Sequence, residues 1–263
     1  MNPLRVWWQI MRHGLPAAVR REWVCVSLSA ALLLAGGVFG GVATALDPDL
    51  AVVFLPAEHL TESPSARVAE LEALEASGGQ VDAAGHTAFS AFLASNNIRV
   101  TVLAFALGLT FGIGTAVVLF FNGALIGCIV YRYVADGVGV FLVAWIGPHG
   151  SIEVPCIILG GAAGLVIARA QWQALANLRS TGATLLARTG PLRHSLVHLV
   201  VGAATLLFPA ALVEGGFSQI NAPTFPYALK IAVAAVLFAA LCAYLFLLPV
   251  GGQALRAGIR HEA

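Results

Sequence analysis

Charged residues are scarce in this chain. Only 10% of its 263 residues are Asp, Glu, Lys or Arg, whereas 59% are hydrophobic and the mean hydropathy is +0.87. Soluble domains carry about 25% charged residues, so this composition excludes an ordinary soluble domain. The formal net charge of +1 is too small to indicate a nucleic-acid partner. The expected environment is the lipid bilayer.

Sequence motifs for metal binding and catalysis are also missing. The four cysteines, Cys25, Cys128, Cys156 and Cys242, form no CxxC pair, which argues against both a zinc site and a disulfide framework. The chain has no GxSxG, Walker, HExxH or Rossmann fingerprint, and its glycines lie mostly in apolar runs. We therefore expect neither an enzyme nor a bound cofactor.

The chain instead contains long apolar runs. A membrane helix needs about 20 apolar residues, and four runs meet this length: residues 24–46, 100–121, 194–213 and 225–250. Between them, residues 138–146 make about half a crossing, followed by Pro148-His149-Gly150 and a second run that ends at residue 168. This pattern predicts an all-α membrane helix bundle of about six transmembrane segments, with a broken or re-entrant central hairpin.

The distribution of charge predicts the orientation. Arginines are frequent in residues 1–23, 169–193 and 251–263, whereas residues 47–95 hold eight acidic residues and a single arginine. Positive residues favour the cytoplasmic side, so both termini are expected there, in a multi-pass protein of the cytoplasmic (inner) membrane. The sequence therefore predicts three parts: a cytoplasmic amphipathic segment at 1–23, a membrane domain at 24–250 with an outer acidic segment at 47–95, and a cytoplasmic tail at 251–263.

Ionisable side chains in the central apolar run form the candidate site. His149 and Glu153 are four residues apart, so a helix places them on one face. Each charged group costs about 2.5–3.5 kcal/mol in a membrane helix, which predicts that they face the bundle interior. They form either a proton or cation site or a structural polar network. A metal site needs a third ligand, which only Glu214 or a distant histidine could supply, so none is expected.

Two asparagines, Asn97 and Asn122, are further candidates for this polar site or for helix caps. Small residues at a spacing of four let helix backbones approach closely. Such pairs are predicted to pack helices together, within the chain or between copies: Gly108 and Gly112, Gly123 and Gly127, Gly160 and Gly164.

Several of these motifs occur together, in order, between residues 16 and 214: Asn96-Asn97-Ile98-Arg99, Gly112-Ile113-Gly114-Thr115, Asn122-Gly123, Pro148-His149-Gly150-x-x-Glu153, GGAAGL at 160–165, and Leu212-Val213-Glu214-Gly215. In this set the chain resembles the stage II sporulation protein M family of integral membrane proteins. The resemblance implies a membrane anchor that assembles with peptidoglycan-degrading partners.

Two functions follow as expectations. The first is a membrane scaffold that assembles as a homo-oligomer and recruits membrane or cell-envelope protein partners through residues 47–95 and the cytoplasmic arginine loop. The second is a transporter or channel in which Glu153 and His149 bind a proton or cation.

Overall fold

The computed structural model describes residues 2–55, 60–76, 96–178, 189–220 and 224–248. Every regular element in these residues is helical, which confirms the prediction of an all-α membrane helix bundle. Five of the described helices are long and apolar enough to cross a membrane. They are α3 (Trp23–Leu46), α7 (Ile113–Ala135), α8 (Gly139–Leu178), α9 (Thr189–Gly215) and α10 (Tyr227–Cys242), which continues as a π-helical turn over Ala243–Leu247.

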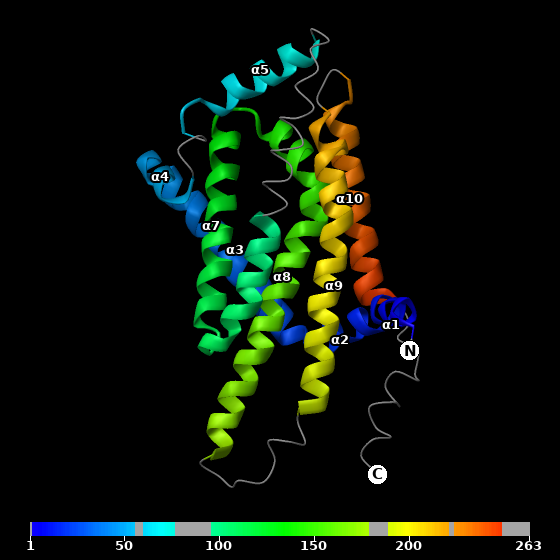
Figure 1. The fold of residues 1–263 in the computed structure, drawn as a ribbon. Helices are drawn as coiled ribbons and strands as arrows, with labels where there is room; N and C mark the ends of the chain where they lie inside the picture. The colour runs from blue at the N-terminus through cyan, green and yellow to red at the C-terminus, as the bar shows by residue number, and fades with distance from the viewer. Residues whose placement is uncertain (1, 56–59, 77–95, 179–188, 221–223, 249–263) are drawn as a thin grey trace.

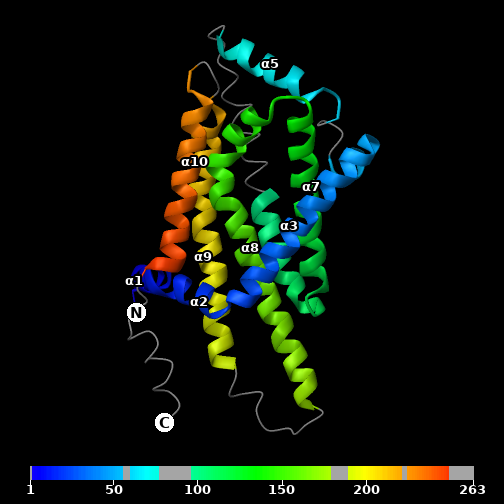
Figure 2. The same cartoon turned by 180° about the vertical axis from the view of Figure 1, so that it is seen from behind.

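The long helices stand side by side and alternate in direction from α7 to α10 (Figures 1 and 2). The helix α5 (Pro64–Ala76) lies across one end of this bundle. At the opposite end lies the N-terminal segment, next to the end of α10, where Arg20 donates to the carbonyl of Leu248 at 2.6 Å. The bundle therefore has an α5 end and an N-terminal end.

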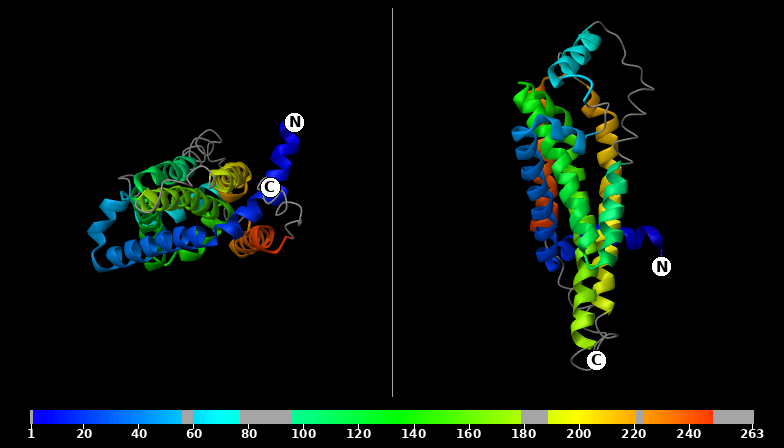
Figure 3. Two further views of the ribbon diagram at one scale, coloured as in Figure 1. Left: turned by 90° about the horizontal axis from the view of Figure 1, so that it is seen from below. Right: turned by 90° about the vertical axis from the view of Figure 1, so that its left-hand side faces the viewer.

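The N-terminal segment runs almost perpendicular to the bundle (Figure 3). It consists of α1 (Pro3–Gln9), a π-helical turn over Ile10–Gly14, and α2 (Leu15–Arg21). The π-helical turn comes directly before Pro16, which has no N–H to continue the regular hydrogen-bond ladder.

The predicted span over residues 100–121 is wrong. Residues 96–106 are helical and pass into a 3₁₀ turn over Leu107–Thr110, after which Phe111 and Gly112 adopt φ values of 56° and 86°. Two successive residues in the left-handed region reverse the chain, and α7 then starts in the opposite direction. The Thr110 hydroxyl accepts a hydrogen bond from the N–H of Gly114 at 2.8 Å, which satisfies a free donor at the start of α7.

The break predicted at Pro148–Gly150 is also wrong, because α8 is one continuous helix of 40 residues that contains Pro148 and Pro155. Proline removes one backbone hydrogen bond, and neighbouring helices and side chains support such positions in membrane helices. Between the two prolines the hydroxyl of Ser151 donates to the carbonyl of Pro148 at 2.8 Å, a hydrogen bond that adds to the helical ladder but does not replace the bond that either proline removes. The discontinuity of this fold is the turn at Phe111–Gly112 instead.

The glycines form close contacts within the chain. Gly36 on α3 lies against the backbone carbonyl of Phe120 on α7, so closely that a Cβ atom would overlap it. Gly123 and Gly127 on α7 lie in the same way against the carbonyls of Leu33 and Gly37. These contacts let α3 and α7 approach along their whole shared length.

The remaining predicted glycines attach the reversed segment to α8. A Cβ atom on Gly108 would overlap the backbone of Gly164, and one on Gly164 would overlap the carbonyl of Ala104. Gly160 lies against Thr101, and Gly112 against the side chain of Ala168. Helix 96–106 is thereby held beside α8, close to the residues of the candidate site.

Candidate functional site

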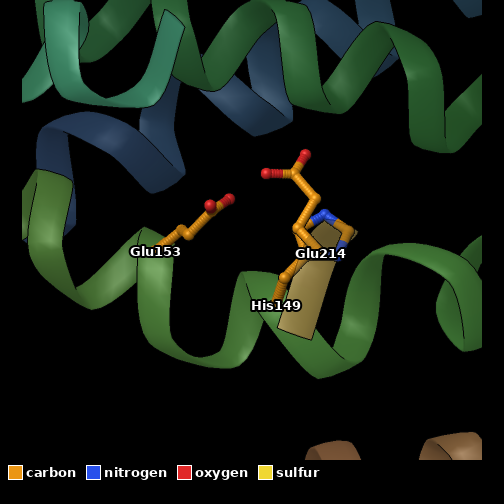
Figure 4. Close-up of side chains that lie close together, drawn as sticks. All are labelled: His149, Glu153 and Glu214. Atoms are coloured by element: carbon orange, nitrogen blue, oxygen red, sulfur yellow. The ribbon is translucent and has the colours of Figure 1, made fainter. Parts of the chain in front are cut away.

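Three ionisable side chains converge in the interior of the bundle. His149 and Glu153 lie one turn apart on α8, and Glu214 lies in the last turn of α9. Their exposed fractions are 5%, 3% and 0%. One donor atom from each lies within 4.8 Å of the others. Figure 4 shows the carboxyl group of Glu153 directed toward that of Glu214, with the imidazole ring beside Glu214. We call these three residues the central cluster.

Asn97 brings a third element to the central cluster. Its amide donates to Oε2 of Glu153 at 2.6 Å, and the Thr101 hydroxyl donates to the backbone carbonyl of Asn97 at 2.7 Å. The other carboxyl oxygen of Glu153, Oε1, is buried and has no hydrogen-bond partner among the described residues. The helix that ends at the left-handed turn therefore fixes one side of this carboxylate and leaves the other side directed at Glu214.

The imidazole is fixed by the loop that follows α9. Nδ1 of His149 lies 2.9 Å from the hydroxyl of Ser218, which belongs to a 3₁₀ turn over Phe217–Gln219. The ammonium group of Lys230, in the first turn of α10, donates to the carbonyls of Ser218 and Ile220 at 2.8 and 2.7 Å. Lys230 and Ser218 are completely buried. The loop, α8 and α10 thus share one hydrogen-bond network.

Electrostatics limits what this arrangement can hold. Two like charges about 4 Å apart repel by about 4 kcal/mol at an effective dielectric constant of about 20, and more in a drier interior. Glu153 and Glu214 face each other in such an interior. The pair is therefore stable only with a proton, a cation or another positive charge close by.

Some of the predicted site residues lie together in the structure, and others do not. It brings together His149, Glu153, Glu214 and Asn97. Asn122 lies half-buried in α7 next to Gly123, and no hydrogen bond in the described part of the chain joins it to the central cluster. Glu214, a candidate for this polar site or for an ordinary carboxylate in an outer loop, belongs to the last turn of α9 and is fully buried.

Sequence reasoning missed Ser218 and Lys230. A usable signal existed for Lys230, because it is the only lysine of the chain and stands at the start of an apolar run. Ser218 gave no signal, since serine is common in loops and its role depends on the position of His149.

A second buried polar group lies toward the N-terminal end and was also missed. Glu22, at the junction of α2 and α3, accepts hydrogen bonds from Arg169 at 2.6 Å and from the Ser195 hydroxyl at 2.8 Å. This carboxylate is buried, and its partners come from α8 and α9. The contacts tie the N-terminal segment to the bundle.

Together, the bundle and the central cluster define a polytopic all-α membrane protein with ionisable groups in its interior. The family model described as stage II sporulation protein M matches residues 29–219, which is most of the chain. The chain therefore belongs to the stage II sporulation protein M family. The match contains the central cluster, Asn97 and Ser218, whereas Lys230 lies beyond it. Comparisons with curated proteins and with solved structures find no match.

Proposed function

We propose that this protein is a membrane transporter in which the central cluster binds a proton or a cation on its way across the bilayer. One observation carries the proposal: two buried carboxyl groups, on α8 and α9, face each other inside a bundle of apolar helices. Such groups are costly in a membrane, and they are typical of ion and proton pathways.

The reversed segment supports this function. Transporters often bind ions where a helix is interrupted and its polar groups become available to the site. Here the helix over residues 96–106 ends in a chain reversal, and its Asn97 contacts Glu153 directly. Asn97 lies in the first described turn of this helix and the reversal lies beyond its other end, so the helix contributes to the central cluster through the contact of Asn97 with Glu153.

The structure corresponds to an occluded state in the proposed cycle, since all three side chains of the central cluster are buried. An apolar groove of about 290 Å³ lies between helix 96–106, α8 and α9, with Thr101, Gly160 and Ala211 in its wall. This lining is unsuitable for an ion. We infer that the central cluster opens toward the α5 end, where the Ser218 loop closes over His149.

The test is a flux assay on purified protein in liposomes, with protons, sodium, potassium and divalent cations offered in turn. Glu153→Gln and Glu214→Gln remove the charges but keep the shapes, and both are expected to lose most of the flux. Glu70→Gln makes the same chemical change at an exposed position on α5 and should keep the wild-type rate. Wild-type flux in folded Glu153→Gln protein would contradict the proposal.

Scaffolding is the second candidate, favoured by the position of α5. This helix lies across the end of the bundle with Glu70 exposed, so an acidic surface is available to a protein partner outside the membrane (Figure 1). We infer a homo-oligomer that recruits cell-envelope partners there. Cross-linking in native membranes should capture the same partner with wild type and Glu153→Gln but lose it with Glu62→Lys/Glu70→Lys. Equal capture by all three proteins would argue against this surface.

A further inference from the structure

We propose that His149, Glu153 and Glu214 form a binding site for one divalent first-row transition-metal ion, of the Zn²⁺ or Mn²⁺ type. This inference builds on the cation site proposed above and names the class of cation. The donor set consists of one imidazole nitrogen and two carboxylate oxygens, within 4.8 Å of one another. Metal–ligand distances of about 2.0–2.2 Å place donor atoms about 3–4 Å apart, so closure of the longest separation by roughly 1 Å accommodates the ion.

Glu153 and His149 each present a donor atom to the central cluster. Oε1 of Glu153 is buried without a hydrogen-bond partner in the described part of the chain, and the side chain is directed into the central cluster (Figure 4). A neutral imidazole that donates from Nδ1 to Ser218 presents a lone pair on Nε2, the nitrogen that a metal would take. A buried oxygen of this kind costs free energy unless something binds to it.

A second layer of hydrogen bonds orients these ligands, as is usual around protein-bound metals. Asn97 holds one oxygen of Glu153, and Ser218 holds the imidazole of His149. Lys230 in turn fixes the backbone of Ser218, because its ammonium group donates a hydrogen bond to the Ser218 carbonyl.

The ligand types indicate which ion is preferred. Imidazole nitrogen suits zinc, iron, cobalt and copper, whereas magnesium and calcium prefer sites made of oxygen alone. Carboxylates extend the range to manganese. We therefore expect Zn²⁺, Co²⁺ and Mn²⁺ to bind more tightly than Mg²⁺ and Ca²⁺. A divalent ion also neutralises the repulsion between Glu153 and Glu214.

The experiment is an equilibrium titration of purified, full-length protein in nanodiscs with Co²⁺ and with Zn²⁺. Wild type should bind one ion per chain, with cobalt spectra typical of nitrogen and oxygen ligands. The variants His149→Ala, Glu153→Gln and Glu214→Gln should each weaken binding by about 100-fold or more. Glu70→Gln and His194→Ala are matched controls, because both side chains are exposed, and their affinities should not change.

Two further variants keep the test decisive if a ligand variant fails to fold. Ser218→Ala and Asn97→Ala leave the three ligands in place and should weaken binding by about 10- to 100-fold through lost orientation. No saturable binding by wild type would overturn the inference. So would undiminished binding in folded Glu153→Gln, or a cobalt–thiolate absorption band, which would assign the ion to cysteine.

The experiments distinguish failure of the metal-site proposal from failure of the transport proposal. Flux that depends on Glu153 in the absence of metal binding would overturn the metal site and leave the proposed transporter standing. Tight binding that depends on all three ligands, without flux of any offered ion, would support the metal site and contradict transport.

Discussion

At the scale of single residues, position rather than residue type decides the role. Glu153 and Glu70 are both glutamates, but the first is buried between helices and the second is exposed on α5. The sequence allowed His149 and Glu153 to be placed on one helix face from their spacing alone. It could not place Glu214, 61 positions further along than Glu153, because that contact depends on how α8 packs against α9.

Lys230 allows a prediction at this scale. Replacement by methionine keeps the length of the side chain but removes two hydrogen bonds to the carbonyls of Ser218 and Ile220. Buried acceptors that lose their donors cost about 1–3 kcal/mol each, so Lys230→Met should lower the unfolding temperature clearly. Thermal unfolding in detergent measures this change, and an unfolding temperature equal to that of wild type would contradict the assigned role.

At the scale of helices, composition identified the membrane spans, but it could not place the chain reversals. Residues 100–121 are apolar throughout, and the turn at Phe111–Gly112 depends on backbone angles that leave no mark in hydropathy. Conversely, Pro148 and Gly150 are residue types that predict a helix break, yet α8 continues through them because neighbouring helices support it. The span that became α3, which follows Glu22 and precedes Asp47, was predicted to within one residue.

The contact between α3 and α7 gives a prediction with an internal control. A Cβ atom at Gly36 would overlap the Phe120 carbonyl, whereas one at Gly37 would meet its nearest neighbour at an ordinary 3.7 Å. Overpacking costs about 1–3 kcal/mol, so Gly36→Ala should destabilise the protein by at least that amount. Gly37→Ala should be neutral or stabilise it by up to about 1 kcal/mol. Equal unfolding temperatures for the two variants would refute this packing.

The attachment of α5 predicts a dependence on pH. Asp136, in the turn between α7 and α8, accepts a hydrogen bond from the backbone N–H of Ser65 at 2.6 Å, which lowers the pKa of this carboxyl group below its ordinary value. A lowered folded-state pKa stabilises the attachment above the ordinary pKa, and this contribution is lost as pH falls through the folded-state pKa. The protection factors of the α5 amides, which are exchange rates corrected for the intrinsic slowing of exchange at low pH, should therefore fall as the pH falls.

The variant Asp136→Asn checks the assignment. It should raise hydrogen exchange in α5 at neutral pH and remove this pH dependence, while Asp49→Asn, at an exposed aspartate in the turn after α3, should leave α5 unchanged. A pH dependence that persists in folded Asp136→Asn protein would show that another group controls the attachment.

At the scale of the whole molecule, the N-terminal segment, which carries four arginines, and α5, which carries the exposed Glu70, lie at opposite ends of the bundle (Figures 1 and 3). The positive-inside rule predicts that the N-terminal end faces the cytoplasm. Single cysteines at Arg5 and Glu70, both exposed, test this in a background without the native cysteines. An impermeant maleimide should label position 70 on intact cells and position 5 only after lysis. Labelling of both positions from outside would contradict the orientation.

The most direct test of the central claim compares three substitutions in one liposome preparation. Glu153→Asp keeps the charge on a shorter side chain, Glu153→Gln keeps the shape without the charge, and Glu70→Gln controls for the chemical change. If the central cluster carries an ion, flux should remain wild-type in Glu70→Gln, fall partly in Glu153→Asp and disappear in Glu153→Gln. Equal flux in all three folded variants would show that the buried carboxyl group only holds the helices together.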